Sequence, residues 1–492
     1  MLIAFFIMAH LTGAAVAGAA LMQVRTPQGT LAWVLALLAV PYLAVPAYWI
    51  LGPSRFQGYV SARRGGDHRL RTAVGEVEAD ARRFRTEIPE TRGGIRAIEQ
   101  LARMPVLRGN RTRLLVDGEE TFPSLFSGLE RARNYALVQF YTIRDDRVGR
   151  RLRDLLLDRA REGVRVYLLF DRVGSRSLPR SYVRDLRRGG VSISAFLSSR
   201  AWIRQRFRPR LQVNFRNHRK IMVVDGHEGW LGGLNASEAY LGRDPRIGAW
   251  RDTHLHLQGP SVTGLQLSFL EDWHWSTGEV LELEWTSRAA QDGPPADPDS
   301  NGSSATGGEG DEAVLVLPSG PADSLETANL MIHHAIHGAR ERFWLATPYF
   351  VPDEGILSAL ELAVLRGVEV RILVPATADV PLVHLAKLAI LPRLLRTGVR
   401  IHRYTEGFMH SKIFLVDDRA AAVGTVNLDN RSLRLNFEVT ALLLDPGAIH
   451  RVERMLETDL SRSEPLTAED LDARPAWERA ASRAAYLLAP IL

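Results

Sequence analysis

The chain of 492 residues contains no cysteine and very little lysine. Without cysteine there is no disulfide framework, no thiolate metal site and no cysteine nucleophile. Lysine occurs only at Lys220, Lys387 and Lys412, although lysine and arginine together number 62. Arginine therefore supplies nearly every positive charge. A position that keeps lysine indicates a need for a compact ammonium group on a flexible stem rather than a planar guanidinium.

The overall balance is that of a folded, basic protein with more than one domain. Hydrophobic residues make up 46% of the chain and charged residues 24%, so a large core can be buried. The formal net charge is +6. A basic surface suits nucleic acid or an anionic membrane, and the N-terminal residues distinguish these two classes of partner.

Two long apolar stretches occupy the N-terminus. They run from Leu2 to Val24 and from Leu31 to Gly52, and each is about as long as a helix needs to cross a bilayer, roughly 20 residues. Together they predict a transmembrane hairpin whose second helix is kinked at Pro41 and Pro46. A cleaved signal peptide is the alternative for the first stretch. Since the first arginine is Arg25, that stretch has no positively charged start of the kind such peptides carry.

Arginines are distributed unevenly around these two stretches. The loop between them holds one arginine, whereas several follow the second stretch, at Arg55, Arg63, Arg64, Arg69 and Arg71. The excess of positive charge marks the cytoplasmic side of a membrane protein. We therefore expect a multi-pass membrane protein with a cytoplasmic catalytic body.

The rest of the chain is an internal duplication. Residues 134–171 and 341–375 each read as a strand, a polar turn, an amphipathic helix, a glycine turn and a second apolar strand. The strand runs are continuously apolar, as is typical when helices cover both faces of a sheet. The sequence therefore predicts an α/β fold given twice, as two halves related by pseudo-twofold symmetry.

Composition places the domain boundaries. We expect a hairpin over 1–52, a basic helical juxtamembrane segment over 53–106, and the two halves over 107–286 and 314–492. Residues 287–313 are rich in Pro, Gly, Ser and Asp and contain almost no large apolar residue, which predicts a flexible linker.

The same short motif occurs once in each half. "HRKIMVVD" and "HSKIFLVD" both fit H-x-K-x4-D. A Gly-x-x-Asn run begins seven residues after the aspartate of each motif. A single His-x-Lys would carry little weight, but two copies with matching tails in matching halves indicate a functional site. The candidate residues are His218, Lys220, Asp225 and Asn235 in the first half, and His410, Lys412, Asp417 and Asn427 in the second.

These residue types suit phosphoryl chemistry. If a strand begins at each histidine, the histidine and the lysine at i and i+2 project from the same face. Folding the halves together then brings two histidines and two lysines into one pocket. One histidine can attack a phosphorus atom while the other protonates the leaving alcohol. The lysines, with Asn235 and Asn427, can hold the phosphoryl oxygens as charge develops, so no metal ion or other cofactor is expected.

The motifs resemble those of the phospholipase D superfamily, and within it the bacterial cardiolipin synthases. "WRDTHLHLQGPSV" from Trp250, "TPYFVPDEGIL" from Thr347 and "GTVNLDNRSLRLNFE" from Gly424 are similar to signatures of that family, and the resemblance covers nearly the whole chain. It implies two α/β halves with the active site at their interface, at the bacterial inner membrane. It also implies transfer of phosphatidyl from one phosphatidylglycerol, through a phosphohistidine, to a second, giving cardiolipin and glycerol.

The resemblance also implies roles for individual residues. One of His218 and His410 is the nucleophile and the other the acid/base; the habit of the superfamily favours His218 as nucleophile, although symmetry leaves the order open. The two lysines bind phosphate. A carboxylate downstream of each motif often orients the histidine, and Asp252 and Glu438 match those places. The motif aspartates then fit loop support better than contact with substrate.

The expected partners are an anionic phospholipid, phosphatidylglycerol, and the cell membrane, with no nucleic acid; the oligomeric state is open. Four alternatives remain. A phospholipase D hydrolase would use the same pocket with water as acceptor, and another transferase would make a different headgroup ester. A nuclease or phosphodiesterase would suit the basic charge but has no need of two membrane helices. A non-catalytic membrane scaffold would not need two intact motifs.

Overall fold

The computed structural model describes residues 2–22, 27–52, 75, 81–86, 88, 94–196, 214–242, 248–285 and 310–491. Residues 53–74, 76–80, 87 and 89–93 of the predicted juxtamembrane segment lie outside the described residues. So do residues 286–309, which contain most of the predicted linker.

Three helices form the N-terminal part, α1 (Leu2–Leu21), α2 (Pro27–Ala39) and α3 (Pro41–Leu51). Within the described residues, α1 alone is long and apolar enough to cross a membrane. The second stretch was expected to form one helix kinked at Pro41 and Pro46, and it forms two separate helices, because α2 ends before Val40, where φ is −137° and ψ is 58°. The ring of Pro41 disfavours a helical conformation at the preceding residue and supplies no N–H. Pro46, by contrast, lies inside α3.

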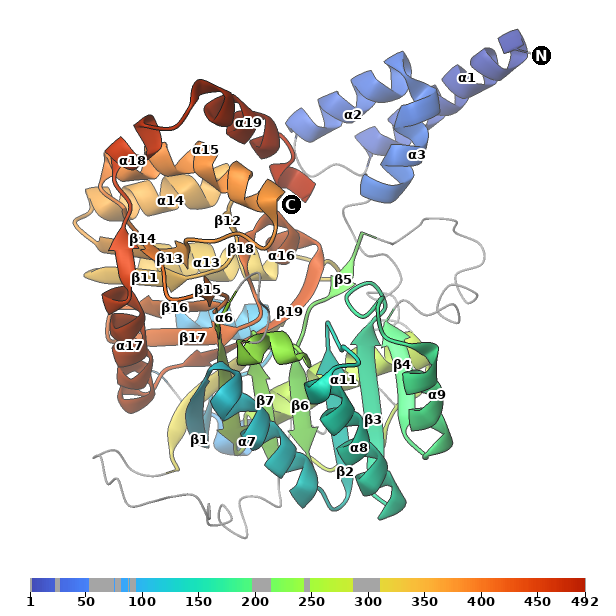
Figure 1. Ribbon diagram of the computed structural model, residues 1–492, viewed down its shortest axis with the longest axis vertical. Helices are drawn as coiled ribbons and strands as arrows, with labels where there is room; N and C mark the ends of the chain where they lie inside the picture. Colours follow the sequence, from blue (N-terminus) through green and yellow to red (C-terminus); the bar gives the residue numbers. More distant parts are fainter. Residues whose placement is uncertain are drawn as a thin grey trace.

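Strands of both halves form one continuous sheet (Figure 1). The first-half strands are β1 (Leu107–Val116), β2 (Tyr135–Phe140), β3 (Arg165–Asp171), β4 (Ser192–Phe196), β6 (Ile221–Val224), β7 (Glu228–Gly232) and β9 (Thr253–Gln258). The second-half strands are β10 (Glu312–Ser319), β11 (Arg342–Ala346), β13 (Glu369–Pro375), β14 (Arg400–Tyr404), β16 (Ile413–Val416), β17 (Ala420–Gly424), β19 (Asn436–Leu443) and β20 (Ser463–Pro465).

The order of these strands confirms the duplication. From the centre outward, the first half runs β1-β9-β7-β6-β2-β3-β4 and the second runs β10-β19-β17-β16-β11-β13-β14, with β20 added at the edge. β1 and β10 pair antiparallel where the halves meet, with Leu107 opposite Val314. Each strand of one half therefore has a counterpart in the other, as the twofold prediction requires.

Helices cover both faces of the sheet, as the continuously apolar strands predict. The helices of the first half are α7 (Asp117–Arg131), α8 (Arg147–Arg161), α9 (Arg180–Arg188) and α11 (Val262–Thr277). Those of the second are α13 (Thr327–Gly338), α14 (Glu354–Leu365), α15 (Pro381–Thr397), α16 (Asn430–Arg434), α17 (Pro446–Ser461), α18 (Ala468–Asp472) and α19 (Ala476–Tyr486). α6 (Ile95–Ala102) precedes the first half in sequence, yet its Ile98 lies in the hydrophobic core of the second. A separate core shared by both halves includes Phe269 of α11 and Val452 of α17.

Matching turns begin and end the matching helices. Asp146 accepts a hydrogen bond from the Gly149 N–H at the start of α8, and Asp353 accepts one from the Ile356 N–H at the start of α14. The glycine turns after these helices, at residues 163 and 367, have φ of +87° and +88°, a region that side chains disfavour. The local strand–helix–strand prediction is therefore correct in both halves.

Candidate active site

The two motifs lie beside short strands that cross between the halves. β5 (Arg216–Asn217) pairs with the start of β19, and β15 (Phe408–Met409) pairs with β8 (Trp250–Arg251). The His218 N–H donates to the Phe437 carbonyl at 2.9 Å, and the His410 N–H donates to the Arg251 carbonyl at 2.7 Å. Each histidine therefore precedes its long strand, β6 or β16, and is held by a strand of the opposite half.

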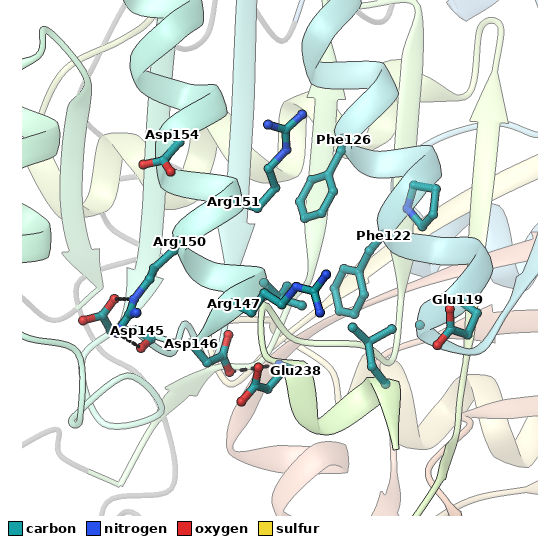
Figure 2. A pocket seen from close by; sticks show the side chains of 14 residues that line it. Glu119, Phe122, Phe126, Asp145, Asp146, Arg147, Arg150, Arg151, Asp154 and Glu238 are labelled. Carbon is teal, nitrogen blue, oxygen red and sulfur yellow. Dashed lines mark hydrogen bonds and ion pairs between the residues drawn. The ribbon is translucent and has the colours of Figure 1, made fainter. Parts of the chain in front are cut away.

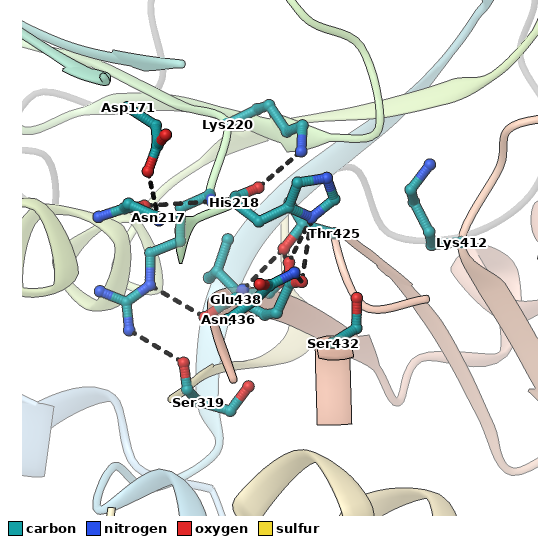
Figure 3. Close-up of polar contacts among 12 residues, drawn as sticks. Asp171, Asn217, His218, Lys220, Ser319, Lys412, Thr425, Ser432, Asn436 and Glu438 are labelled. Carbon is teal, nitrogen blue, oxygen red and sulfur yellow. Dashed lines mark hydrogen bonds and ion pairs between the residues drawn. The ribbon is translucent and has the colours of Figure 1, made fainter. Parts of the chain in front are cut away.

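Each histidine contacts a carboxylate from the opposite half. His218 Nδ1 lies 2.9 and 3.0 Å from the two oxygens of Glu438 (Figure 3). His410 Nδ1 lies 2.6 Å from Asp252 Oδ2. Chain order assigns Asp252 to the first motif and Glu438 to the second, and the structure exchanges them. The reason is the pairing of β5 with β19 and of β15 with β8, which places each histidine beside the far carboxylate.

Both motif lysines are buried next to the histidines. Lys220 Nζ donates to the His218 carbonyl at 2.7 Å, and Lys412 Nζ donates to the His410 carbonyl and lies 2.9 Å from His410 Nδ1. Burial lowers the pKa of Lys412 to about 8 and that of Lys220 well below its usual value. The third lysine, Lys387, lies apart on α15, where its Nζ donates to the Pro375 carbonyl.

The charges of the two motifs act on one another, so the motifs share one site. Burial, then Lys412, Lys220 and His218, hold the pKa of His410 well below its ordinary value. Burial likewise lowers the pKa of His218 to about 4, against the opposing effect of Glu438. Both imidazoles are therefore neutral at pH 7 before an anion binds.

The two carboxylates differ in their protonation. Burial raises the pKa of Asp252, although Lys412 opposes the rise. Burial also acts to raise the pKa of Glu438, but His218 and Lys220 outweigh it and leave that pKa lowered overall. Glu438 is therefore the firmly ionised partner, whereas Asp252 retains a proton more readily.

The carboxylates of the two motif aspartates accept hydrogen bonds from backbone N–H groups, away from the histidines and lysines of the site. Asp225 and Asp417 follow the far ends of β6 and β16, and both have positive φ, 50° and 47°. Each carboxylate accepts hydrogen bonds from three consecutive backbone N–H groups. The donors are Arg133, Asn134 and Tyr135 for Asp225, and Arg340, Glu341 and Arg342 for Asp417. They hold the loops before β2 and β11, which is the supporting role that the sequence favoured for these aspartates.

The two asparagines are placed differently. Asn235 is held by its neighbours, because its Oδ1 accepts from the Thr142 N–H at 3.0 Å and its Nδ2 donates to the Tyr240 hydroxyl at 2.8 Å. Asn427 Oδ1 is buried and has no hydrogen-bond partner among the described residues. Of the two amides, Asn427 is the better placed to receive a bound donor group.

The residues that precede these asparagines also differ between the halves. A Cβ at Gly233 would lie 2.0 Å from Asp252 Oδ1, so only glycine leaves room for that carboxylate. The counterpart, Thr425, accepts a hydrogen bond from the Val439 N–H at 2.9 Å, next to the longer side chain of Glu438. A short carboxylate beside glycine in one half corresponds to a long carboxylate beside threonine in the other.

Several residues around the histidines were not predicted. The rings of Tyr141 and Trp250 lie 5.0 Å from His218 and 4.9 Å from His410. Among the buried arginines, Arg219 binds Asp272 at 2.8 Å, and Arg251 binds Asp459 at 2.7 Å. In an arginine-rich chain, local spacing does not distinguish a buried arginine from a surface one. The position of Arg219 inside the first motif was the one available signal.

A groove of about 930 Å³ lies elsewhere, between α7 and α8 (Figure 2). Phe122 and Phe126 line one side, and Arg147 and Arg151 line the other. No residue of either motif lines it. Among the described residues, no group of three or more His, Cys, Asp or Glu side chains is arranged to hold a metal ion.

Family models match most of the chain. A model described as "Cardiolipin synthase, PLD-like domain" matches residues 125–246 and again 332–460. A model described as "Phospholipase_D-nuclease N-terminal" matches residues 11–53, the region of α1 to α3. The repeated match coincides with the two halves of the sheet.

Curated relatives match over almost the full length. Cardiolipin synthase A of Pseudomonas putida (strain GB-1) is 43% identical over 488 residues, 98% of this chain and 97% of the relative. Cardiolipin synthase A of Pseudomonas entomophila (strain L48) is 44% identical with the same coverage. Among solved structures, the phosphatidylserine synthase of Haemophilus influenzae Rd KW20 has a similar fold. Its TM-score is 0.62 at 16% identity, over 81% of this chain and 100% of that one.

Proposed function

The chain belongs to the cardiolipin synthase family of phospholipase D-like proteins, and on that premise we propose that it joins two molecules of phosphatidylglycerol. One molecule donates its phosphatidyl group, the other accepts it, and the products are cardiolipin and glycerol. The observation that carries the proposal is the site itself, with two histidine–carboxylate pairs and two buried lysines between the halves.

In the first step, His218 Nε2 attacks the phosphorus of the donor. Glu438 accepts the Nδ1 hydrogen of His218, which leaves Nε2 unprotonated and stabilises the charge that the ring acquires. The phosphorus–nitrogen bond forms as the bond to the glycerol oxygen breaks. The pair of His410 and Asp252 retains a proton until the anionic substrate has bound. The departing glycerol oxygen then takes a proton from His410 Nε2. Lys220 and Lys412 hold the phosphoryl oxygens.

In the second step, a hydroxyl of the acceptor phosphatidylglycerol replaces the departed glycerol. It gives its proton to His410, and its oxygen attacks the phosphorus as the bond to His218 breaks. Both histidines return to their starting states. Water in the same position would give phosphatidic acid, so transfer depends on which acceptor reaches the phosphohistidine first.

A product assay tests this proposal. The purified protein in detergent receives phosphatidylglycerol as its only lipid, with His218→Ala and His410→Ala as controls. Cardiolipin and free glycerol, both lost in the controls, are expected. Phosphatidic acid in place of cardiolipin would make the protein a hydrolase. Equal behaviour of wild type and controls would overturn the site.

We also propose a membrane topology and domain organisation. Residues 1–52 anchor the chain in the bacterial inner membrane as a multi-pass segment, 53–106 form the juxtamembrane segment, and 107–286 and 314–492 form a cytoplasmic body joined by the linker 287–313. Support comes from the apolar α1, whose side chains are largely exposed, and from the arginines that follow α3.

Because the chain has no cysteine, single-cysteine variants test the topology directly. In intact spheroplasts, a membrane-impermeant maleimide should label Gln28→Cys, at the start of α2. It should label Ala480→Cys, on the exposed side of α19, only after the membrane is opened. Labelling of Ala480→Cys in intact spheroplasts would reverse the orientation.

A further inference from the structure

The proposed reaction brings two anionic phosphates into one site. The donor phosphate sits between His218 and the two lysines. The acceptor lipid carries its own phosphate, which a three-carbon glycerol bridge separates from the attacked phosphorus. A site built for this acceptor therefore needs a second group of cations, one glycerol length from His218.

Two arginines from opposite halves interact with each other near His218. Arg216 lies on β5, two residues before His218, and Arg431 lies on α16. Arg431 crosses to the first half, where it donates to the Asn214 carbonyl at 3.0 Å and to Asn214 Oδ1 at 2.8 Å. Both arginines are half-buried, and Arg216 Nη1 donates to the Phe215 carbonyl at 2.8 Å.

Tyr141 links this pair of arginines to the reacting histidine. Its ring lies 5.0 Å from the ring of His218 and 5.4 Å from Lys220 Nζ. Its hydroxyl hydrogen-bonds to Arg216. Burial raises the pKa of Tyr141, and both Arg216 and Arg431 oppose that rise. Tyr141 thus contacts both Lys220, at the proposed donor phosphate, and Arg216.

The local charge favours an anion between the two arginines. Burial and the neighbouring Arg216 lower the pKa of Arg431, so the two guanidinium groups repel each other. Two carboxylates also act on this pair, Asp171 on Arg216 and Asp429 on Arg431. Asp171 accepts from three N–H groups, including that of Asn217, and Asp429 accepts from the Ser432 N–H. Burial raises the pKa of both carboxyls, and the two arginines oppose that rise.

We propose that Arg216 and Arg431 form the binding site for the phosphate of the acceptor lipid, and so select phosphatidylglycerol over an uncharged alcohol. The inference rests on the proposed function. A phosphodiester oxygen between the two guanidinium groups would relieve their repulsion, and it would place the terminal hydroxyl of the same glycerol at the phosphohistidine.

A partition experiment tests the assignment. The enzyme receives phosphatidylglycerol together with radiolabelled glycerol, so both acceptors compete for the same phosphohistidine. Transfer to phosphatidylglycerol gives cardiolipin, and transfer to glycerol gives labelled phosphatidylglycerol. The ratio of these products depends neither on donor binding nor on the amount of folded enzyme.

In Arg431→Gln and in Arg216→Gln, the ratio of cardiolipin to labelled phosphatidylglycerol should fall about tenfold to a hundredfold. A fall of this size corresponds to the loss of one charge-assisted hydrogen bond to the acceptor phosphate. Labelled glycerol should still be incorporated at a rate within a few-fold of wild type. Arg431→Lys, which keeps the charge, should restore part of the ratio. The matched control is Arg434→Gln on the same helix, whose guanidinium pairs with Glu326 and Asp353 and should leave the ratio unchanged.

An unchanged ratio in both glutamine variants would overturn the assignment. An equal fall of both products would also overturn it, because it would mean that the arginines only support the segment that carries His218. Failure of the proposed function has a different result: wild type itself would form no cardiolipin, whatever its exchange with glycerol.

Discussion

The two histidine centres have the same topology and different chemistry. Each histidine follows a two-residue strand, pairs with a strand of the opposite half and contacts a carboxylate there. His218 has the ionised Glu438, supported by Thr425, whereas His410 has Asp252, whose pKa burial raises, beside Gly233. Duplication made the centres alike, and the different residues around them shift the pKa values of the two carboxylates in opposite directions.

The supporting arginines differ in the same way. Near His218 the buried arginine is Arg219, inside the first motif, whereas the corresponding position of the second motif is Ser411. Near His410 it is Arg251, which precedes the carboxylate. Each arginine pairs with an aspartate of the helix beneath it, on α11 or α17. Both arginines belong to the first half, Arg219 between β5 and β6 and Arg251 on β8, so the two centres obtain their buried arginine from different places in the chain.

The largest expected effect separates nucleophile from acid. His218→Asn and His410→Asn should each lower cardiolipin synthesis about 10⁴-fold or more. A donor with p-nitrophenol as leaving group needs no proton, so His410→Asn should still release one equivalent of nitrophenol and stop at the phosphohistidine. His218→Asn should release none. A burst from His218→Asn would exchange the two roles.

Substitution of the two carboxylates should lower kcat by different amounts. Glu438→Gln should lower kcat about a thousandfold or more, because an amide can donate to Nδ1 and favour the tautomer that blocks Nε2. Asp252→Asn should cost only about tenfold to a hundredfold, since that carboxyl is already protonated more readily. The measurement is steady-state kinetics on variants with matched melting temperatures. Equal losses would mean that the two centres are equivalent.

The residues behind the carboxylates should have smaller effects. Gly233→Ala places a methyl group against Asp252 and should displace it and His410, with a loss of about a hundredfold in kcat. Thr425→Ser keeps the hydroxyl beside Glu438 and should stay within a few-fold of wild type. These two variants are compared by kcat at saturating lipid. Full activity of Gly233→Ala would show that Asp252 has room to move.

The smallest effect concerns pH. In the proposed mechanism Lys412 binds phosphate only while protonated, and burial lowers its pKa to about 8. As pH rises through about 8 its charge is lost, so kcat/KM should be about tenfold lower at pH 9 than its plateau near pH 7. Lys412→Arg keeps its charge at these pH values, and its profile should lack this decline, at a lower plateau. A decline that persists in Lys412→Arg would assign the titration to another group.

Local patterns predicted much of the fold and half of the site. The spacing of the motifs identified both histidines and both lysines, and the repeated strand–helix–strand pattern predicted the matching halves. The exchange of Glu438 and Asp252 could not be predicted, because it depends on two pairings of two-residue strands too short to leave a periodic signal. The break at Val40 was underestimated, since Pro41 and Pro46 look equivalent in sequence and only the first divides the helices.

The exchange of carboxylates between the halves also determines when, during synthesis of the chain, the contact between His218 and Glu438 can form. Glu438 lies 220 residues after His218 in the chain. At a synthesis rate of about 5–20 residues per second, roughly 10–45 s separate the appearance of the two side chains on a ribosome. During that interval the first motif is already made beside a membrane full of phosphodiesters, yet its imidazole lacks the group that would orient it. Under the proposed mechanism, reactivity toward lipid therefore begins only when the second half has folded against the first.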